Sequence, residues 1–136
     1  MKTQVSSDEV LDALEDEAIS ILRATAASFA RPVMMYSIGK DSSVLLHLAR
    51  KAFFPAPIPF PFLHIDSQWE FREVIEHRDR MADEIGFELI IARSEQGIAE
   101  GVSPMSHGIH EYTRIMRTVP LLEALASHGF DAAIGG

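Results

Sequence analysis

A short polar turn at residues 37–43 contains the residue types that bind phosphate groups. It reads SIGKDSS and lies between an apolar run at 33–36 and a stretch with helical spacing. Backbone N–H groups at the start of a helix are unpaired, and the helix dipole adds partial positive charge there. Gly39 allows close approach of the backbone, and Lys40 offers a mobile ammonium group for polyphosphate oxygens. The turn predicts a phosphate site, with an ordinary serine-capped turn as the alternative. Hydroxyl donors would come from Ser37, Ser42 and Ser43.

Two common phosphate loops do not fit these residues. A Walker loop requires a glycine where Met34 stands, and a serine or threonine where Asp41 stands. The dinucleotide-binding fingerprint requires glycines at 37, 39 and 42, and only Gly39 is present. The turn therefore indicates a phosphate loop of another kind.

Apolar periodicity along the rest of the chain alternates between the strand and the helix pattern. We predict strands at 33–36, 60–65, 87–92 and 130–134. We predict helices from 7 to about 29, at 43–54, from a capping box at 67–70 to about 85, and from about 109 to 128 with a break at 119–120. Residues 94–108, rich in glycine, serine and polar side chains, are expected to form a loop. This alternation is typical of an α/β, Rossmann-like domain: an open parallel sheet of about four strands with helices on both faces.

Helix ends and apolar faces complete the prediction. Ser6 and Glu9 have the spacing of a capping box, and Gly86 and Gly129 are expected to end helices. The side chains expected to face the core from the first helix are Leu11, Leu14, Ala18, Ile21, Leu22, Thr25 and Phe29. Those expected to face inward from the second helix are Val44, Leu45, Leu48 and Ala49.

Ligands of an open parallel sheet bind outside the carboxyl ends of the strands, where the strand order reverses. With the order 3-2-1-4, that point lies between the first and the fourth strand. Ser37 and the pair Gly135 and Gly136 would then face each other across the bound ligand. Asp66, which follows the second strand, would lie toward the part of the ligand that is not phosphate, or it would serve only as a helix-capping aspartate.

Composition excludes several classes of protein. The chain has 136 residues, 47% of them hydrophobic and 24% charged, as expected for one globular domain over residues 1–136. Its formal net charge of −8 argues against broad nucleic-acid binding. The sequence has no cysteine, which excludes disulfides and thiolate metal sites within it. No membrane segment or secretory signal is visible after Lys2, so the cytoplasm is the default compartment.

Two further expectations concern the histidines and the last residues. The histidines have no metal-ligand spacing, so no zinc site is expected, and His47 and His64 are interpreted as structural residues. A Gly-Gly pair directly after a strand usually opens a turn into a covering helix. We therefore expect the sequence to be the N-terminal fragment of a longer chain, truncated at its C-terminal end.

Residues 36–42 resemble the pyrophosphate loop of the ATP pyrophosphatase superfamily, whose usual form is Ser-Gly-Gly-x-Asp-Ser. Ile38 departs from that form, and the loop is similar instead to the variant in the small-subunit family of bacterial sulfate adenylyltransferases. The likeness extends over 46–53, 59–61, 63–66 and 71–73 and resumes at 107–108 and 129–133. At 67–70 the chain reads SQWE where that family more often has TGWK. Tyr112 stands where the family tends to have histidine, and Arg117 replaces a lysine.

The resemblance implies an adenine nucleotide alpha hydrolase-like fold. It also implies a reaction in which ATP and sulfate give adenosine 5′-phosphosulfate and pyrophosphate, and a partner, the large GTPase subunit. Lys40 and Asp41 would be the catalytic residues. Mg²⁺ would bridge phosphate oxygens, with Asp41 either binding the ion or orienting the loop. The residues expected at the ATP are Ser37, Ile38, Gly39, Lys40, Asp41, Ser42, Ser43, Asp66, Gly135 and Gly136.

Two alternatives remain open from the sequence. One is an enzyme like phosphoadenylylsulfate reductase, whose cysteine chemistry would have to come from residues outside this sequence. The other is an adenine-nucleotide-binding module without catalysis that acts through a partner protein.

Overall fold

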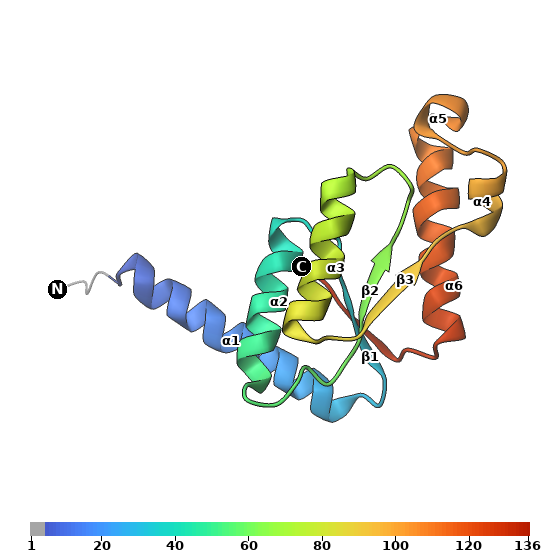
Figure 1. The fold of residues 1–136 in the computed structure, drawn as a ribbon. Coiled ribbons are helices and arrows are strands. Elements are labelled where there is room, and N and C mark those ends of the chain that lie inside the picture. The colour runs from blue at the N-terminus through green and yellow to red at the C-terminus, as the bar shows by residue number, and fades with distance from the viewer. Residues whose placement is uncertain (1–4) are drawn as a thin grey trace.

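The computed structural model describes residues 5–136, so Lys2 and the sequence interpretation that involves it lie outside the described residues. Helices and strands alternate along the chain (Figure 1). Their bounds are α1 Ser7–Ser28, β1 Pro32–Met35, α2 Lys40–Phe53, β2 Phe62–Ile65, α3 Arg72–Ile85, β3 Leu89–Ala92, α4 Glu95–Ala99, α5 Pro104–Thr113, the π-helical turn η1 Arg114–Thr118, α6 Val119–Ser127 and β4 Ala132–Ile134.

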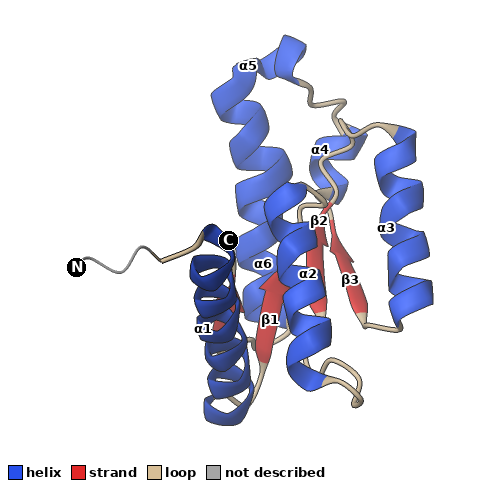
Figure 2. Cartoon of the chain, turned by 90° about the vertical axis from the view of Figure 1, so that its left-hand side faces the viewer, coloured by secondary structure: helices blue, strands red, loops and turns tan. Residues whose placement is uncertain are grey.

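The strands form one parallel sheet in the order β3-β2-β1-β4, which confirms the predicted α/β fold and its strand order. The register pairs Val33 with Ala133 and Leu63 with Ile90, so the carboxyl ends of neighbouring strands lie at the same edge. Helices α1, α2 and α3 cover one face of the sheet and α6 covers the other (Figure 2).

An aromatic cluster fills the space between the sheet and helices α1–α3. Tyr36, Phe62 and Phe87 are almost completely buried. The rings of Phe62 and Phe87 stack with centroids 4.4 Å apart, and Tyr36 meets Phe62 edge-on at 5.7 Å. Because Phe62 is on β2 and Tyr36 directly follows β1, this cluster fixes the point at which the chain leaves β1 toward α2.

The structure confirms two of the predicted helix ends and corrects a third. Ser6 and Glu9 form a reciprocal capping box at α1, and Gly86 ends α3 with a left-handed φ of 81°. The capping box predicted at 67–70 is wrong. The N-cap of α3 is Phe71, which makes no side-chain capping bond, and Ser67 is completely buried in the preceding segment.

The prediction of a loop at 94–108 is also wrong, because the segment contains α4 and the start of α5. Ser94 and Ser103 cap these helices, and Pro104 occupies the first turn of α5. The helix break predicted at 119–120 is instead the π-helical turn η1, through which the chain stays helical. Pro120 has no N–H to offer the preceding turn, and a wider π-turn accommodates that loss.

Much of the apolar face predicted for α1 lies in solvent. Leu11, Leu14 and Ile21 are each more than half exposed, and only Ile19 and Leu22 are buried. The N-terminal half of α1 extends past the sheet, as Figure 1 shows, so it has no layer to pack against. On α2, Val44 is likewise 57% exposed rather than inward-facing. Within residues 5–136, no helix combines the length and the apolar character needed to cross a membrane.

Candidate functional site

The turn that precedes α2 leaves the N-terminus of that helix open. Gly39 is the N-cap, and no side chain caps the helix. The Ser42 hydroxyl donates back to the Gly39 carbonyl at 3.1 Å, and the Ser37 hydroxyl donates to Ser42 Oγ at 3.3 Å. Lys40 is exposed in the first turn. The first N–H groups of α2 are therefore available to an anion, with a lysine beside them.

Ile38 has an unusual backbone conformation in this turn. Its φ is 69°, in the left-handed region that a β-branched residue rarely adopts. Its side chain packs against the aromatic core, which holds the conformation in place. Strained backbone of this kind persists where packing enforces it, and it is frequent at ligand sites. The position is one where the resembling loops carry glycine, which adopts this φ without strain.

A cavity of about 440 Å³ opens at the carboxyl ends of β1 and β2. One side is formed by the end of β1 and the turn, another by β2 and the segment that leads into α3, and the third by η1 and α6. The polar groups on its wall come from Tyr36, Ser37, His64, Glu70, Arg117 and Thr118. Its volume lies within the range of small-molecule sites, about 300–1,000 Å³.

Of the site residues predicted from the sequence, Ser37 lines this cavity. Lys40 and Asp41 lie exposed at the start of α2, while Ser42 is buried and bonds within the turn. The remaining turn residues, Ile38, Gly39 and Ser43, lie between Ser37 and the first turn of α2, with Ile38 and Ser43 half-buried.

The other predicted residues, Asp66, Gly135 and Gly136, are not among those that line the cavity. Gly135 and Gly136 follow β4 beside β1, and a Cβ on Gly136 would come within 2.9 Å of Leu45 Cδ1 on α2. The cavity is therefore on the β2 side of β1, whereas the sequence led us to expect the β4 side. Asp66 Oδ1 accepts a hydrogen bond from the Gln68 N–H at 3.0 Å. It closes a turn after β2 and does not cap α3, so the helix-capping interpretation is wrong.

His64, Glu70 and Arg117 are the cavity residues that were not selected from the sequence. His64 is on β2 and almost completely buried, with Nδ1 2.9 Å from the Tyr36 carbonyl and Nε2 2.9 Å from Glu70 Oε2. The sequence gives a weak indication that His64 lies at a ligand site. It is the second-last residue of the strand predicted at 60–65, and ligands of parallel sheets bind at the carboxyl ends of strands. Glu70 follows six positions later through an irregular segment, and no spacing rule relates the two.

The two arginines of η1, Arg114 and Arg117, have different surroundings. Arg114 donates to Glu111 at 2.9 Å on the surface, and this pair raises the pKa of Arg114 and lowers that of Glu111. Arg117 lines the cavity, and no carboxylate pairs with it in the part of the chain that the structure describes. The π-turn contributes to this placement, because an extra residue in one turn rotates the side chains that follow. Arg117 is thus the cation available to an anion in the cavity.

Tyr36 is a further polar group without a partner near the cavity. Its hydroxyl is buried and has no hydrogen-bond partner among the described residues, and burial raises the pKa of Tyr36 above its ordinary value of 10.0. Among the same residues, no group of three or more histidine, aspartate or glutamate side chains is placed to hold a metal ion.

Residues 31–136 match the family described as the phosphoadenosine phosphosulfate reductase domain. This range contains all the strands and every residue of the cavity wall.

Several curated proteins are similar over almost the whole chain, and they carry the name sulfate adenylyltransferase subunit 2. The proteins from Chelativorans sp. (strain BNC1) and Myxococcus xanthus are each 60% identical over 126 residues, or 93% of this chain. The protein from Photobacterium profundum is 59% identical over the same length. The chain spans only 42%, 41% and 42% of these relatives, respectively.

Among solved structures, the phosphate complex of phosphoadenylyl-sulfate (PAPS) reductase from Candida auris is similar in fold. The match covers 99% of this chain and 70% of that one, with a TM-score of 0.73 and 16% sequence identity. At this identity, the similarity supports the arrangement of helices and strands and nothing finer.

Proposed function

The chain belongs to the phosphoadenosine phosphosulfate reductase domain family, and from that premise we infer that it is the nucleotide-binding part of a sulfate adenylyltransferase. The proposed reaction joins sulfate to the adenylyl group of ATP. The observation that carries this proposal is the cavity beside the open N-terminus of α2, with Ser37 on one side and Arg117 on the other. The high identity to proteins named sulfate adenylyltransferase subunit 2 supports this reaction over the others in the family.

The turn at 37–43 is suited to the leaving group of that reaction. A sulfate oxygen would attack the α-phosphorus of ATP, forming an S–O–P bridge, and the bond from the α-phosphorus to the bridging oxygen of the β-phosphate would break. Pyrophosphate then leaves with that oxygen. The N–H groups of α2 and the Lys40 ammonium group would hold the β and γ phosphates and stabilise the charge that develops on them.

Arg117 is suited to the other end of the reacting group. Its unpaired guanidinium lies at the cavity on η1, across from Ser37. A planar guanidinium binds tetrahedral oxyanions through two parallel hydrogen bonds, so it could hold sulfate or the α-phosphate in line for attack. No covalent intermediate on the protein is required, and catalysis would come from positioning and charge stabilisation.

Magnesium would enter as the complex with ATP. Mg²⁺ commonly binds to one or two protein carboxylates together with substrate phosphates, and Asp41 is exposed in the first turn of α2. The absence of a larger acidic cluster among the described residues fits this mode of binding. Asp66, Gly135 and Gly136 remain proposed nucleotide-binding residues, although they are not among the residues that line the cavity.

The name subunit 2 of the relatives indicates that those proteins act with another chain. We infer that the partner here is a large GTPase subunit, since sulfate activation by ATP is uphill and needs coupling to a second hydrolysis. Use of ATP also agrees with the cytoplasmic location expected from the sequence.

The deciding experiment is sulfate-dependent exchange of labelled pyrophosphate into ATP by the intact protein, with and without the GTPase partner. Exchange that requires sulfate is the expected result, and omission of sulfate is the control. ATP binding without exchange in either condition would support the non-catalytic module instead. Absence of ATP binding would remove the proposed site.

A further inference from the structure

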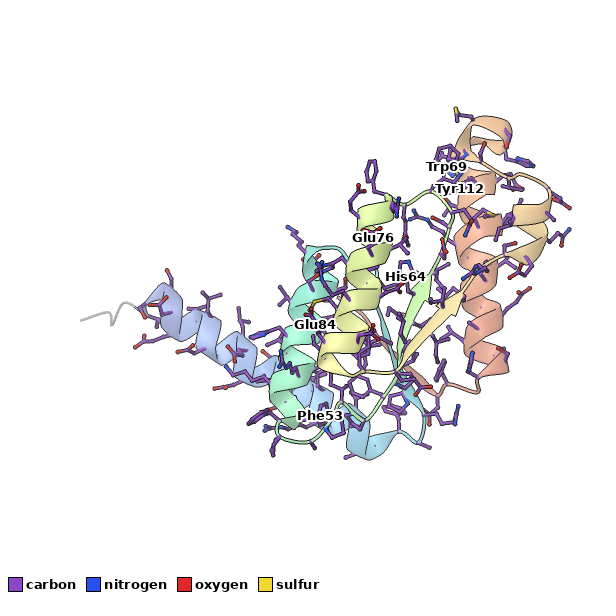
Figure 3. The ribbon with its side chains drawn as sticks, in the orientation of Figure 1. Phe53, His64, Trp69, Glu76, Glu84 and Tyr112 are labelled. Atoms are coloured by element: carbon purple, nitrogen blue, oxygen red, sulfur yellow. The ribbon has the colours of Figure 1, made fainter. Side chains whose placement is uncertain are left out.

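A buried histidine–glutamate pair lies in the wall of the cavity, apart from the phosphate-binding turn. His64 projects from β2 on the side toward α3 (Figure 3). The exposed fraction of its side chain is 1%, and that of Glu70 is 18%. Nε2 of His64 and Oε2 of Glu70 are 2.9 Å apart.

The hydrogen bonds of this pair fix the orientation of the imidazole ring. A backbone carbonyl only accepts a hydrogen bond, so His64 Nδ1 is the donor in its 2.9 Å contact with the Tyr36 carbonyl. The other ring nitrogen, Nε2, then faces Glu70 Oε2 at 2.9 Å. Contacts on both ring nitrogens hold the imidazole in one orientation.

Glu70 is held in position from several directions. His64 bonds both to Glu70 and to Tyr36, which directly precedes the phosphate-binding turn. The segment between His64 and Glu70 is tied to α5, because the Tyr112 hydroxyl donates to the Ser67 carbonyl at 3.3 Å. Figure 3 shows Trp69 and Tyr112 at this junction. A side chain held in this way presents its free oxygen in one direction only.

The second oxygen of Glu70 is the group that remains for a ligand. Oε2 takes the bond to His64, and Oε1 has no donor within residues 5–136. Glu70 and Arg117 belong to different walls of the same cavity. Phosphate or sulfate would be drawn to the guanidinium and repelled from the carboxylate. A neutral O–H or N–H donor would be favoured at Glu70.

We propose that Glu70, positioned by His64, is the specificity-determining acceptor for a neutral donor group on the nucleoside half of the bound nucleotide. The inference rests on the proposed function, because it takes ATP as the ligand. In this arrangement, η1 and the turn bind the phosphate half of ATP, and Glu70 orients its nucleoside half. The donor is either a ribose hydroxyl or the exocyclic amine of adenine, which are the neutral donors that ATP carries.

The test measures the affinity of the intact protein for ATP and for three analogues that each lack one donor: 2′-deoxy-ATP, 3′-deoxy-ATP and inosine 5′-triphosphate. The unmodified protein is expected to bind one of them about tenfold more weakly than ATP, the effect of one charge-assisted hydrogen bond. Glu70→Met is expected to bind ATP as weakly as that analogue, with no further loss for the analogue itself. The analogue that loses affinity identifies the donor.

Two additional variants control this result. Glu76→Met removes a carboxylate of the same type from α3, where it pairs with Arg72 on the surface, and is expected to leave every affinity unchanged. Glu70→Gln keeps an acceptor oxygen and is expected to retain part of the discrimination between ATP and the analogue. If Glu70→Met does not fold, Glu70→Gln is compared with the unmodified protein in its place.

The possible outcomes separate this inference from the proposed function. If the unmodified protein binds ATP but treats all three analogues alike, or if Glu70→Met keeps full discrimination, the role of Glu70 is overturned and the ATP site stands. If the unmodified protein does not bind ATP, the proposed function itself fails. A tenfold loss shared by one analogue and Glu70→Met supports the inference.

Discussion

The two faces of the sheet are packed in different ways. Toward α1–α3, the core consists of large side chains, including Met34, Tyr36, Phe62 and Phe87, most of them nearly inaccessible to solvent. Toward α6, the buried cluster is small, with Val33, Leu63 and Ala124 at its centre and partly exposed apolar side chains around it. The larger core includes Tyr36 and Ile38, so it holds the end of β1 and the turn at 37–43. The turn η1, which carries Arg117, belongs to neither core, because its buried residue Met116 packs with Val102 and Tyr112. The two walls of the proposed site are therefore supported by different clusters.

The largest effect on stability is expected from substitutions of Phe62 and Leu63, adjacent residues of β2 whose side chains point to opposite faces of the sheet. Phe62→Ala should lower the free energy of unfolding by about 4 kcal/mol, because it leaves a cavity in the aromatic cluster. Leu63→Ala should cost about 2 kcal/mol, since the smaller cluster can relax around it. Urea unfolding of both variants measures the difference. Equal losses, or a larger one for Leu63→Ala, would contradict the distinction between the faces.

Gly97→Ala is expected to have the next largest effect on the free energy of unfolding. Gly97 is buried where α4 meets η1, and a Cβ there would collide with the Met116 sulfur and lie 2.9 Å from Ser94 Oγ. The overpacking should cost about 2 kcal/mol in thermal unfolding. Ile98→Ala, a partly exposed neighbour on the same helix, is the control and should stay within about 0.5 kcal/mol. A stable Gly97→Ala variant would show that η1 can shift, and with it Arg117.

Lys40→Ala tests the face that holds the turn. Loss of a charge-assisted contact with phosphate should weaken ATP binding about tenfold or more, or at least about 1.4 kcal/mol. Lys51→Ala at the other end of α2, where the lysine pairs with Glu15, is the matched control and should not change the affinity. Titration calorimetry with ATP measures both. Unchanged affinity in Lys40→Ala would contradict the assignment of the turn.

Arg117→Ala tests the opposite wall. If Arg117 holds sulfate or the α-phosphate, its loss should reduce sulfate-dependent pyrophosphate exchange about tenfold while changing ATP affinity less than Lys40→Ala does. Arg114→Ala is the control, because Arg114 is paired with Glu111 on the surface. Equal exchange by the two variants would remove Arg117 from the reaction.

The smallest effect is expected from Tyr36→Phe. The Tyr36 hydroxyl is buried without a partner, so its removal should change the free energy of unfolding by less than about 0.5 kcal/mol, or increase it slightly. The raised pKa predicts a difference at high pH. Above pH 10.0 the unfolded chain releases a proton that the folded chain retains, so the stability contributed by Tyr36 falls as pH rises. Unfolding curves of both proteins at pH 8 and above 10 are expected to show a larger loss of stability in the unmodified protein than in Tyr36→Phe.

The sequence predicted features whose causes lie within a few neighbouring residues. The capping box at Ser6 and the left-handed end of α3 at Gly86 depend on local spacing, and both are confirmed. The observed strand order is the one assumed in placing the ligand, although the sequence pattern did not itself determine it. Helix α4 and the start of α5 were missed although Ser94 and Ser103 are ordinary caps, because glycine and polar residues obscured the helical spacing.

The cavity wall was harder to predict, because its polar groups come together only through tertiary contacts. Nothing in the spacing of His64 and Glu70 indicates a hydrogen bond, and the link from His64 to the Tyr36 carbonyl joins neighbouring strands. Arg117 has the same residue type as Arg114, and only the π-turn and the Glu111 pair distinguish them. Sequence patterns identified the turn at 37–43 as a candidate phosphate site, interpreted His64 as a structural residue, and assigned no role to Glu70.

The conformation of Ile38 has a consequence for how a ligand would meet the turn. Glycine at that position would let the segment sample many shapes, and binding would have to restrict them. A β-branched side chain locked against the core loses that freedom when the protein folds. The amide groups of the turn would thus already be ordered when a phosphate binds. The entropy lost in ordering them is a cost of folding and not of binding.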